Sequence, residues 1–353
     1  MIKGEIKNLK TPYILASYLS ADTLAIDTIA VDTRGRFNYQ AHVDTLTTFS
    51  LYLNNYESTA VVFVDKDQKL TVKGDALFPD LIRINGNEIN NDLTSFKMNN
   101  QDLLKQRGQL LLNHLEGAES DTTLNSSISR HEEMGKINAL NHELTLKAEE
   151  YIKENPSKMS SLILISNFFM NSDNPAALER VLEYLQGYVT QTEMAERLTA
   201  YSEKLNRSAE GAPMPYFRLT DNEGNIITSN DYQGKYLVLS FVSATGVESR
   251  ETVKLLKSAY NRLEQDSVAF LTVYIDTEQF PLEYVESDSV PWTVVVEEQS
   301  WGADIVENFN VQYVPLNIVI SPNRTIQVRN IAAQGVVDEI QKSSEKETTI
   351  VNE

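Results

Sequence analysis

The sequence contains no cysteine. This absence excludes disulfide bonds, thiolate metal sites and cysteine nucleophiles from the chemistry of the chain. It does not identify a redox compartment, because a chain without cysteine is stable in either. Basic residues are also few: 31 Lys and Arg stand against 50 Asp and Glu, which gives a net charge of −19. Binding to phosphates needs clustered Lys and Arg, and none is present, so a nucleic-acid partner is not expected.

Long apolar runs are missing as well. No segment reaches the roughly 18 apolar residues of a membrane-spanning helix, and the nearest candidate, residues 162–170, is interrupted by Ser166 and Asn167. The first residues, MIKGE, do not form a secretory signal. The residues alone therefore predict either a cytoplasmic protein or one whose targeting segment precedes Met1. The histidines lack metal-ligand spacing, and no Gly-rich phosphate loop is present, so neither a metal nor a cofactor is predicted.

The chain divides by pattern into three segments and a short tail. Residues 1–96 contain short apolar runs between turn signals, which is typical of an antiparallel β-sandwich-like domain. Residues 97–208 have helical spacing of apolar residues and few strand signals, so they predict a helical linker domain. Residues 209–343 have α/β character, and residues 344–353 are polar and predict a frayed tail.

The α/β segment has a recognisable order of elements. Two apolar runs of buried-strand length, 236–241 and 269–275, flank an amphipathic helix, which predicts a βαβ unit with parallel strands. Two further runs, 316–320 and 325–328, flank a Ser-Pro-Asn-Arg turn and predict a hairpin.

Four motifs in this segment occur in the order found in one family. They are GAPMPYFRL at 211–219, DNEGN at 221–225, DYQGKYLVL at 231–239 and VQYVP at 311–315. Together they resemble the TlpA and ResA type of thioredoxin-like domain, within the alkyl hydroperoxide reductase and thiol-specific antioxidant superfamily. The two earlier segments resemble, less specifically, the β-domain and helical linker of envelope lipoproteins of Gram-negative gut bacteria. This resemblance implies a thioredoxin-like α/β fold for 209–343 and a periplasmic or outer-membrane-anchored protein.

The redox motif of that family has no counterpart here. The family pattern, roughly FWAxWCxxCR, aligns with FVSATGVESR at 241–250, so Gly246 and Ser249 occupy the cysteine positions. The flanking aromatics become Val242 and Thr245. Glycine offers no nucleophile, and a serine nucleophile needs a nearby base. All four histidines precede this segment: His42, His114, His131 and His142. We therefore predict no catalytic residue and expect Ser249 to satisfy backbone N–H groups at a helix start.

The remaining features predict a binding role. Pro315 matches the family's cis-proline, which faces the redox loop, and either the fold alone or an extended partner explains its presence. The predicted contact surface is formed by the altered loop and this proline: Val242, Thr245, Val247, Glu248, Val314 and Pro315.

The leading hypothesis is a redox-inactive, non-enzymatic envelope protein that binds a protein or peptide partner. Membrane attachment is expected only through a lipid anchor on a cysteine upstream of Met1. Two alternatives stay open: a thiol–disulfide oxidoreductase or antioxidant protein, as the resemblance implies, and a structural accessory of an outer-membrane complex.

Overall fold

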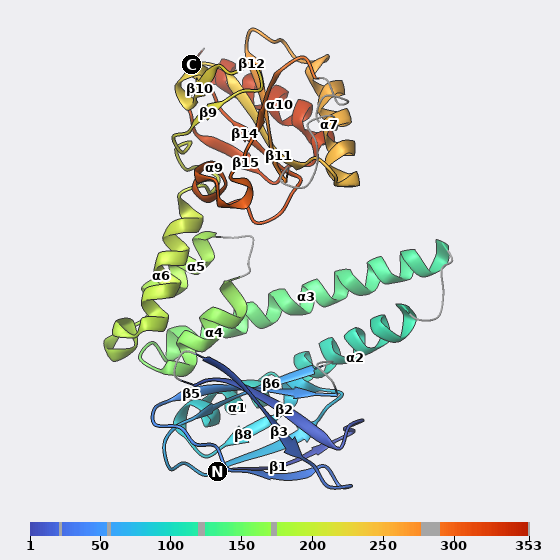
Figure 1. Ribbon diagram of the computed structural model, residues 1–353, viewed down its shortest axis with the longest axis vertical. Helices are drawn as coiled ribbons and strands as arrows, with labels where there is room; N and C mark the ends of the chain where they lie inside the picture. The colour runs from blue at the N-terminus through green and yellow to red at the C-terminus, as the bar shows by residue number, and fades with distance from the viewer. Residues whose placement is uncertain (21–22, 55–57, 119–123, 171–174, 277–289, 352–353) are drawn as a thin grey trace. The chain divides into compact units, whose positions relative to one another are not determined.

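The computed structural model describes residues 1–20, 23–54, 58–118, 124–170, 175–276 and 290–351. The chain forms two compact units, Met1–Leu198 and Thr199–Glu353. Figure 1 shows the helices and strands of each unit.

The first unit begins with a β-domain of two four-stranded sheets. One sheet has the order β4-β1-β7-β8 and the other β3-β2-β5-β6. The strands are β1 (Ile2–Lys7), β2 (Tyr13–Ser20), β3 (Thr23–Ala30), β4 (Arg36–Tyr39), β5 (Thr47–Leu53), β6 (Ser58–Val64), β7 (Leu70–Asp75) and β8 (Arg83–Asn85), with a 3-10 turn, η1 (Pro79–Leu81), before β8.

The two sheets share one hydrophobic core, as a sandwich requires. Both contribute alternate, fully buried residues to it, for example Ile2 and Val72 from one sheet and Phe49 and Val62 from the other. The predicted β-sandwich is therefore present. It is not wholly antiparallel, because β1 pairs in parallel with β7, with Gly4 opposite Val72. The long connection between these strands contains the second sheet, which gives the chain room for this parallel crossover.

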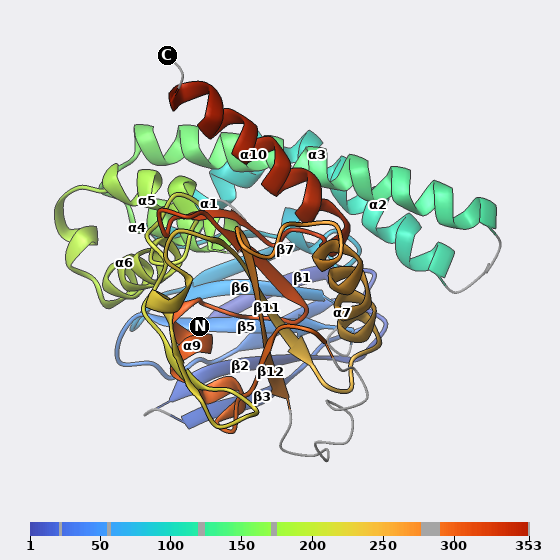
Figure 2. The same ribbon diagram turned by 90° about the horizontal axis from the view of Figure 1, so that it is seen from above.

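A helical layer follows in the same unit. Its elements are α1 (Glu88–Asn99), α2 (Gln101–Ala118), α3 (Leu124–Glu154), α4 (Met159–Phe169), α5 (Pro175–Glu183), η2 (Gly187–Gln191) and α6 (Glu193–Asn206), of which α6 continues into the second unit. Both views show α2 and α3 side by side (Figures 1 and 2). Helix begins at Glu88, earlier than the sequence predicts, because Asn87 caps α1 by accepting from the Asn90 amide at 2.9 Å. Within the described residues, no helix is long and apolar enough to cross a membrane.

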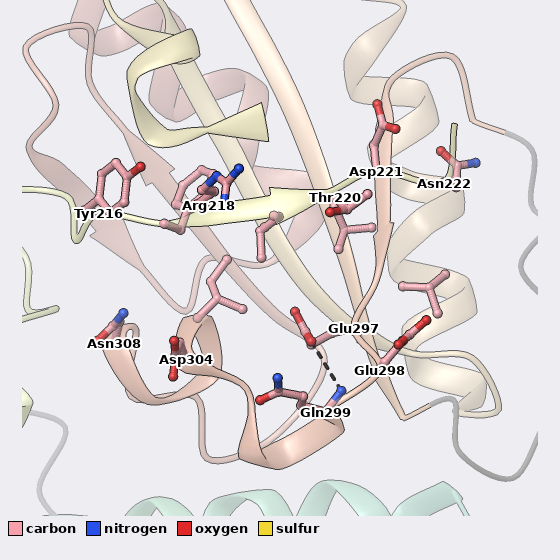
Figure 3. Close-up of a pocket in the computed structure, with 15 residues that line it drawn as sticks. Tyr216, Arg218, Thr220, Asp221, Asn222, Glu297, Glu298, Gln299, Asp304 and Asn308 are labelled. Carbon is pink, nitrogen blue, oxygen red and sulfur yellow. Dashed lines mark hydrogen bonds between the residues drawn. The ribbon is translucent and has the colours of Figure 1, made fainter. Parts of the chain in front are cut away.

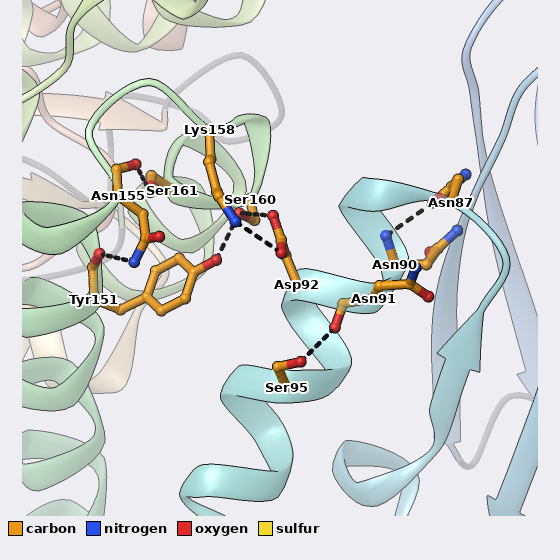
Figure 4. A network of polar contacts seen from close by, with 10 residues as sticks. All are labelled: Asn87, Asn90, Asn91, Asp92, Ser95, Tyr151, Asn155, Lys158, Ser160 and Ser161. Atoms are coloured by element: carbon orange, nitrogen blue, oxygen red, sulfur yellow. Dashed lines mark hydrogen bonds and ion pairs between the residues drawn. The ribbon is translucent and has the colours of Figure 1, made fainter.

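Polar side chains join the helical layer to the β-domain (Figure 4). Asn90, almost fully buried, accepts from the Phe63 amide of β6 at 3.1 Å and also donates to the Phe63 carbonyl oxygen at 2.6 Å. Two residues later, Asp92 accepts from Lys158 at 3.0 Å and from Ser160 at 3.3 Å, which ties α1 to α4. These contacts fix α1 between β6 and the later helices.

An ion-pair cluster joins α3 to α5. Both Glu149 carboxylate oxygens accept from Arg180, at 3.1 and 3.0 Å, and Lys153 lies 3.1 Å away. Hydrogen bonding to Arg180, followed by that to Lys153, outweighs desolvation and lowers the pKa of Glu149 to about 2.

The second unit contains a five-stranded sheet and a small hairpin. The sheet has the order β13-β12-β11-β14-β15, and β9 pairs with β10 apart from it. The elements are β9 (Arg218–Thr220), β10 (Ile226–Thr228), η3 (Ser229–Tyr232), β11 (Tyr236–Ser243), α7 (Val247–Tyr260), β12 (Val268–Asp276), β13 (Thr293–Val296), η4 (Ser300–Gly302), α9 (Asp304–Asn308), β14 (Leu316–Ile320), β15 (Ile326–Arg329), η5 (Ala333–Gly335) and α10 (Val336–Val351). The βαβ unit β11-α7-β12 is parallel and the β14-β15 hairpin is antiparallel, so both predictions are confirmed.

Separate apolar cores cover the two faces of this sheet. On one face, α7 and α10 pack on alternate residues of the central strands, such as Val238 and Phe270. On the other face, α9 and the β9-β10 hairpin pack on Leu239, Leu271 and their neighbours. Helix α10 continues to Val351, so the polar residues from Ser344 extend a helix rather than a frayed tail.

Candidate functional site

The loop between β11 and α7 follows a strand that is buried along its whole length. Both faces of the sheet are covered, so every residue of β11 is inaccessible, including its last two, Val242 and Ser243. Val242 is 0% exposed and packs against Val253, Tyr274 and Val294. Its assignment to a binding surface is therefore wrong: the position that is aromatic in the family is a core position here.

Two serines hold the loop by hydrogen bonds to its own backbone. Ser249, 2% exposed, accepts from the Ser243 amide at 3.0 Å. Ser243 in turn accepts, through Oγ, from the amides of Thr245 and Gly246 at 3.3 Å each. Ser249 is thus a backbone acceptor, as expected, but the amide that it satisfies belongs to Ser243 at the end of β11 and not to the start of the helix. The amides of Thr245 and Gly246, which precede the first turn of α7, are thus bonded within the loop.

The backbone of Gly246 has a conformation that residues with a side chain also adopt. It is the N-cap of α7, with φ −66° and ψ 127°, values that any amino acid adopts. A Cβ atom placed on it lies 3.5 Å from the Cβ of Ser249. Disulfide-bonded cysteines have Cβ atoms about 3.5–4.5 Å apart. The Cβ–Cβ distance between the two positions where the family has cysteine therefore falls within the disulfide range.

The exposed part of the loop is short. Val247 is 73% exposed, and Glu248 beside it is also exposed. Thr245 and Gly246 are half-buried. The surface that the loop offers is thus apolar at Val247 and negative at Glu248.

Pro315 lies at the same end of the sheet. The Val314–Pro315 peptide bond is cis. Strand β14 pairs antiparallel with β11, with Leu316 opposite Phe241. Continuing this register by one residue brings Pro315 opposite Val242, next to the start of the loop. Val314 and Pro315 are half-buried, and Tyr313 is 50% exposed. The structure thus brings together the loop and the proline that the sequence motifs suggested.

A half-buried arginine anchors the segment before Pro315. Arg329, on β15, donates to the carbonyl oxygens of Asn310 at 2.9 Å and Ser208 at 3.3 Å. The Arg329 amide also donates to Glu210 at 2.9 Å. Burial lowers the pKa of Arg329. These bonds hold the 310–315 segment against the edge of the sheet.

The chemistry available at this site is limited. The sequence supplies no thiol, the Ser249 hydroxyl is buried and already bonded, and every histidine lies in the first unit. Within the described residues, no group of three or more His, Asp or Glu side chains is placed to hold a metal ion. The arrangement can present a contact surface, but its own side chains cannot exchange a disulfide.

A cavity of about 720 Å³ in the same unit was not indicated by any pattern in the sequence. It lies between β9 and the segment from β13 to α9. Figure 3 shows polar side chains on both sides of the cavity. Tyr216 and Arg218 line it from β9 and its approach, and Glu297, Glu298 and Asp304 line it from the opposite side. The adjacent glutamates 297 and 298 were visible in the sequence, but nothing there placed them opposite the hairpin.

The second unit has a thioredoxin-like fold. Its central parallel βαβ unit, the antiparallel strand that begins beside a cis-proline, the final hairpin and the closing helix define this class. Residues 211–329 match the model of the AhpC/TSA family. The family resemblance and the α/β fold predicted for this segment are confirmed.

The chain is also similar, at low identity, to several solved structures. The thioredoxin domain of a thiol-disulfide oxidoreductase from Bacteroides vulgatus is 23% identical, with a TM-score of 0.35, and the match covers 38% of this chain and 96% of that one. A thioredoxin-like protein from Bacteroides caccae is 15% identical, with a TM-score of 0.44, over 64% of this chain and 87% of that one. A thiol-disulfide oxidoreductase from Bacteroides fragilis is 21% identical, with a TM-score of 0.34, over 37% and 98%. No curated protein gives a significant match.

Proposed function

We propose that this chain is a redox-inactive thioredoxin-like protein of the bacterial cell envelope that binds a protein or peptide partner. The observation that carries the proposal is a redox-site frame that persists without its sulfurs. The cis-proline, the helix start and the Cβ geometry of positions 246 and 249 are all retained, while the chain has no cysteine. Fold and chemistry separate in this way because function depends on the site and not on the fold.

The proposed contact surface is the exposed part of the loop together with the proline segment. It consists of Thr245, Val247, Glu248, Val314 and Pro315, without Val242. Val247 supports it most directly, because a strongly exposed apolar side chain at the tip of an otherwise bonded loop gains free energy when a partner covers it. Tyr313, half exposed beside the cis bond, adds an aromatic residue of the kind enriched in interfaces.

An envelope location, with any membrane attachment through a lipid anchor upstream of Met1, rests on the family resemblance. Its test is fractionation of the native organism: recovery in the cytoplasmic fraction contradicts it.

The experiment is affinity capture from native envelope extract with the wild type and a Thr245→Glu/Val247→Glu variant. The control is Ile226→Glu, which places one such charge on another exposed apolar residue of this unit, 57% exposed on β10. We expect one partner to be retained by the control and lost by the loop variant. A partner retained by all three proteins moves the function away from the loop, and no partner in any sample contradicts the proposal.

A further inference from the structure

Strand β13 has an open edge in this structure. It is the last strand of the five-stranded sheet, and among the described residues no strand pairs with its outer side. The Glu297 amide points inward and donates to Tyr274 of β12 at 2.9 Å, whereas the Val294 carbonyl oxygen points outward and accepts from the Asn222 amide at 3.1 Å. Backbone groups alternate along a strand, so Val296 directs its N–H and C=O outward, into the cavity that it lines.

Strand β9 faces this edge across the cavity. Asp221 and Ser229 close the hairpin through amides bonded to Asn225 and Phe217, at 2.9 and 3.1 Å. By the same alternation, Arg218 and Thr220 direct their backbone groups away from β10. Both residues line the cavity. The turn that follows β9 therefore meets β13 at the Asn222–Val294 bond, and the outward backbone groups of Arg218, Thr220 and Val296 have no partner among the described residues.

The lining of the opening selects for a particular side-chain chemistry. Its buried floor is apolar, formed by Phe217, Leu219, Val295 and Ile305. Its rim carries the carboxylates of Glu297, Glu298 and Asp304 against the single cation of Arg218 (Figure 3). Glu298 and Asp304 are exposed, so a cation can approach them without desolvating the protein. The volume, about 720 Å³, lies within the roughly 300–1,000 Å³ of pockets that hold specific ligands.

We propose that this opening binds an extended peptide segment with alternating basic and apolar side chains, which adds as a strand to the open edge of β13. The peptide backbone pairs with Val296, its apolar side chains meet the floor, and its basic side chains meet Glu298 and Asp304. Strand addition of this kind takes affinity from the backbone and specificity from alternate side chains. The site is separate from the β11–α7 loop and does not depend on the function proposed for that loop.

The test uses a labelled, alternating lysine–valine peptide and fluorescence anisotropy with the whole chain. Two further peptides serve as probes: the glutamate–valine counterpart, and the lysine–valine peptide with alternate amides N-methylated, which keeps the charge and loses donors. We expect the first to bind with a dissociation constant below about 1 mM. We expect no saturable binding of the other two. Absence of binding by the first peptide, or equal binding of all three, overturns the proposal.

Matched variants locate the site. Val296→Pro removes the outward N–H without touching the bonds to β12, and Val296→Ala keeps it; we expect the former to bind about tenfold more weakly than the latter. Glu298→Lys should weaken binding by roughly three- to tenfold. Glu264→Lys, which makes the same charge change at an exposed residue away from the cavity, should leave binding unchanged.

The loop variant Thr245→Glu/Val247→Glu separates the two proposals. We expect it to bind the lysine–valine peptide as the wild type does, whatever happens to a natural partner. Equal binding by Val296→Pro and Val296→Ala, or loss of peptide binding in the loop variant alone, places the peptide elsewhere and overturns the inference.

Discussion

Replacing Gly246 and Ser249 with cysteine should install a disulfide without backbone movement. The Cβ–Cβ separation of 3.5 Å lies at the short end of the range of about 3.5–4.5 Å for disulfides. The φ of Gly246 is negative, so a side chain causes no backbone strain there. The atom closest to the added Cβ, Ser249 Oγ at 3.3 Å, is the one that the second substitution replaces.

The expected magnitude follows from the small loop that the disulfide closes. Four residues, 246 to 249, give a loop-closure entropy worth about 2 kcal/mol at 25 °C. For a unit of this size, that corresponds to a rise of about 4–8 °C in the melting temperature of the oxidised form over the reduced form. The melting temperatures to compare are those of the oxidised and reduced forms of the same variant. Substitution of Ser249 removes the bond from the Ser243 amide in both forms, because sulfur is a weak acceptor.

The assay is thiol alkylation with mass spectrometry after equilibration with oxidised and reduced glutathione, followed by thermal unfolding of each form. The single variants Gly246→Cys and Ser249→Cys are the controls, and the absence of other cysteines makes each readout unambiguous. Intermolecular dimers in place of an internal disulfide, or a lower melting temperature on oxidation, would refute the claim that the site geometry persists.

Three further changes test other parts of the structure. Ser249→Ala leaves the buried amide of Ser243 without its acceptor and should destabilise the second unit by about 1–3 kcal/mol in urea unfolding; a value near zero contradicts the structural role. Glu149 has a pKa lowered in the folded state, so its contribution to stability is present above the unfolded value and is lost as the pH falls from about 4.5 towards 2; thermal unfolding of Glu149→Gln should lack this part of the acid transition, and an unchanged pH profile refutes it. Arg329→Met removes the donors to Asn310 and should raise the hydrogen-exchange rate of residues 310–315, whereas equal rates show that the anchor is unimportant.

The architecture of the second unit could be predicted because local signals and spacing agree. Two apolar runs around an amphipathic helix indicated β11, α7 and β12, and the Ser-Pro-Asn-Arg turn indicated the last hairpin. The first unit was harder. The parallel pairing of β1 with β7 joins residues far apart in the sequence, and no local pattern in the sequence specifies such a partner. Likewise, the spacing of apolar residues predicts helix only from residue 97, although the Asn87 side chain already caps α1.

The candidate site shows a similar division. The cysteine positions and Pro315 follow from alignment of motifs along the chain. The burial of Val242 does not, because it depends on the second face of the sheet being covered by Val253, Tyr274 and Val294. The cavity at β13 is a consequence of two strands that meet at one bond and then separate, and that geometry exists only after folding.

In this loop the redox sulfurs are absent, and serine hydroxyl groups accept hydrogen bonds from the backbone instead. A redox loop must leave its sulfurs accessible and its helix-start amides available, and both requirements work against stability. Here Ser249 accepts a hydrogen bond from the Ser243 amide, and sulfur would accept this bond only weakly. Ser243 accepts hydrogen bonds from the amides of Thr245 and Gly246. As a result, the amides of Ser243, Thr245 and Gly246 are hydrogen-bonded within the loop, and its apolar tip, Val247, is exposed. A rigid loop with an exposed apolar tip suits binding, because little conformational entropy remains to be lost when a partner covers it.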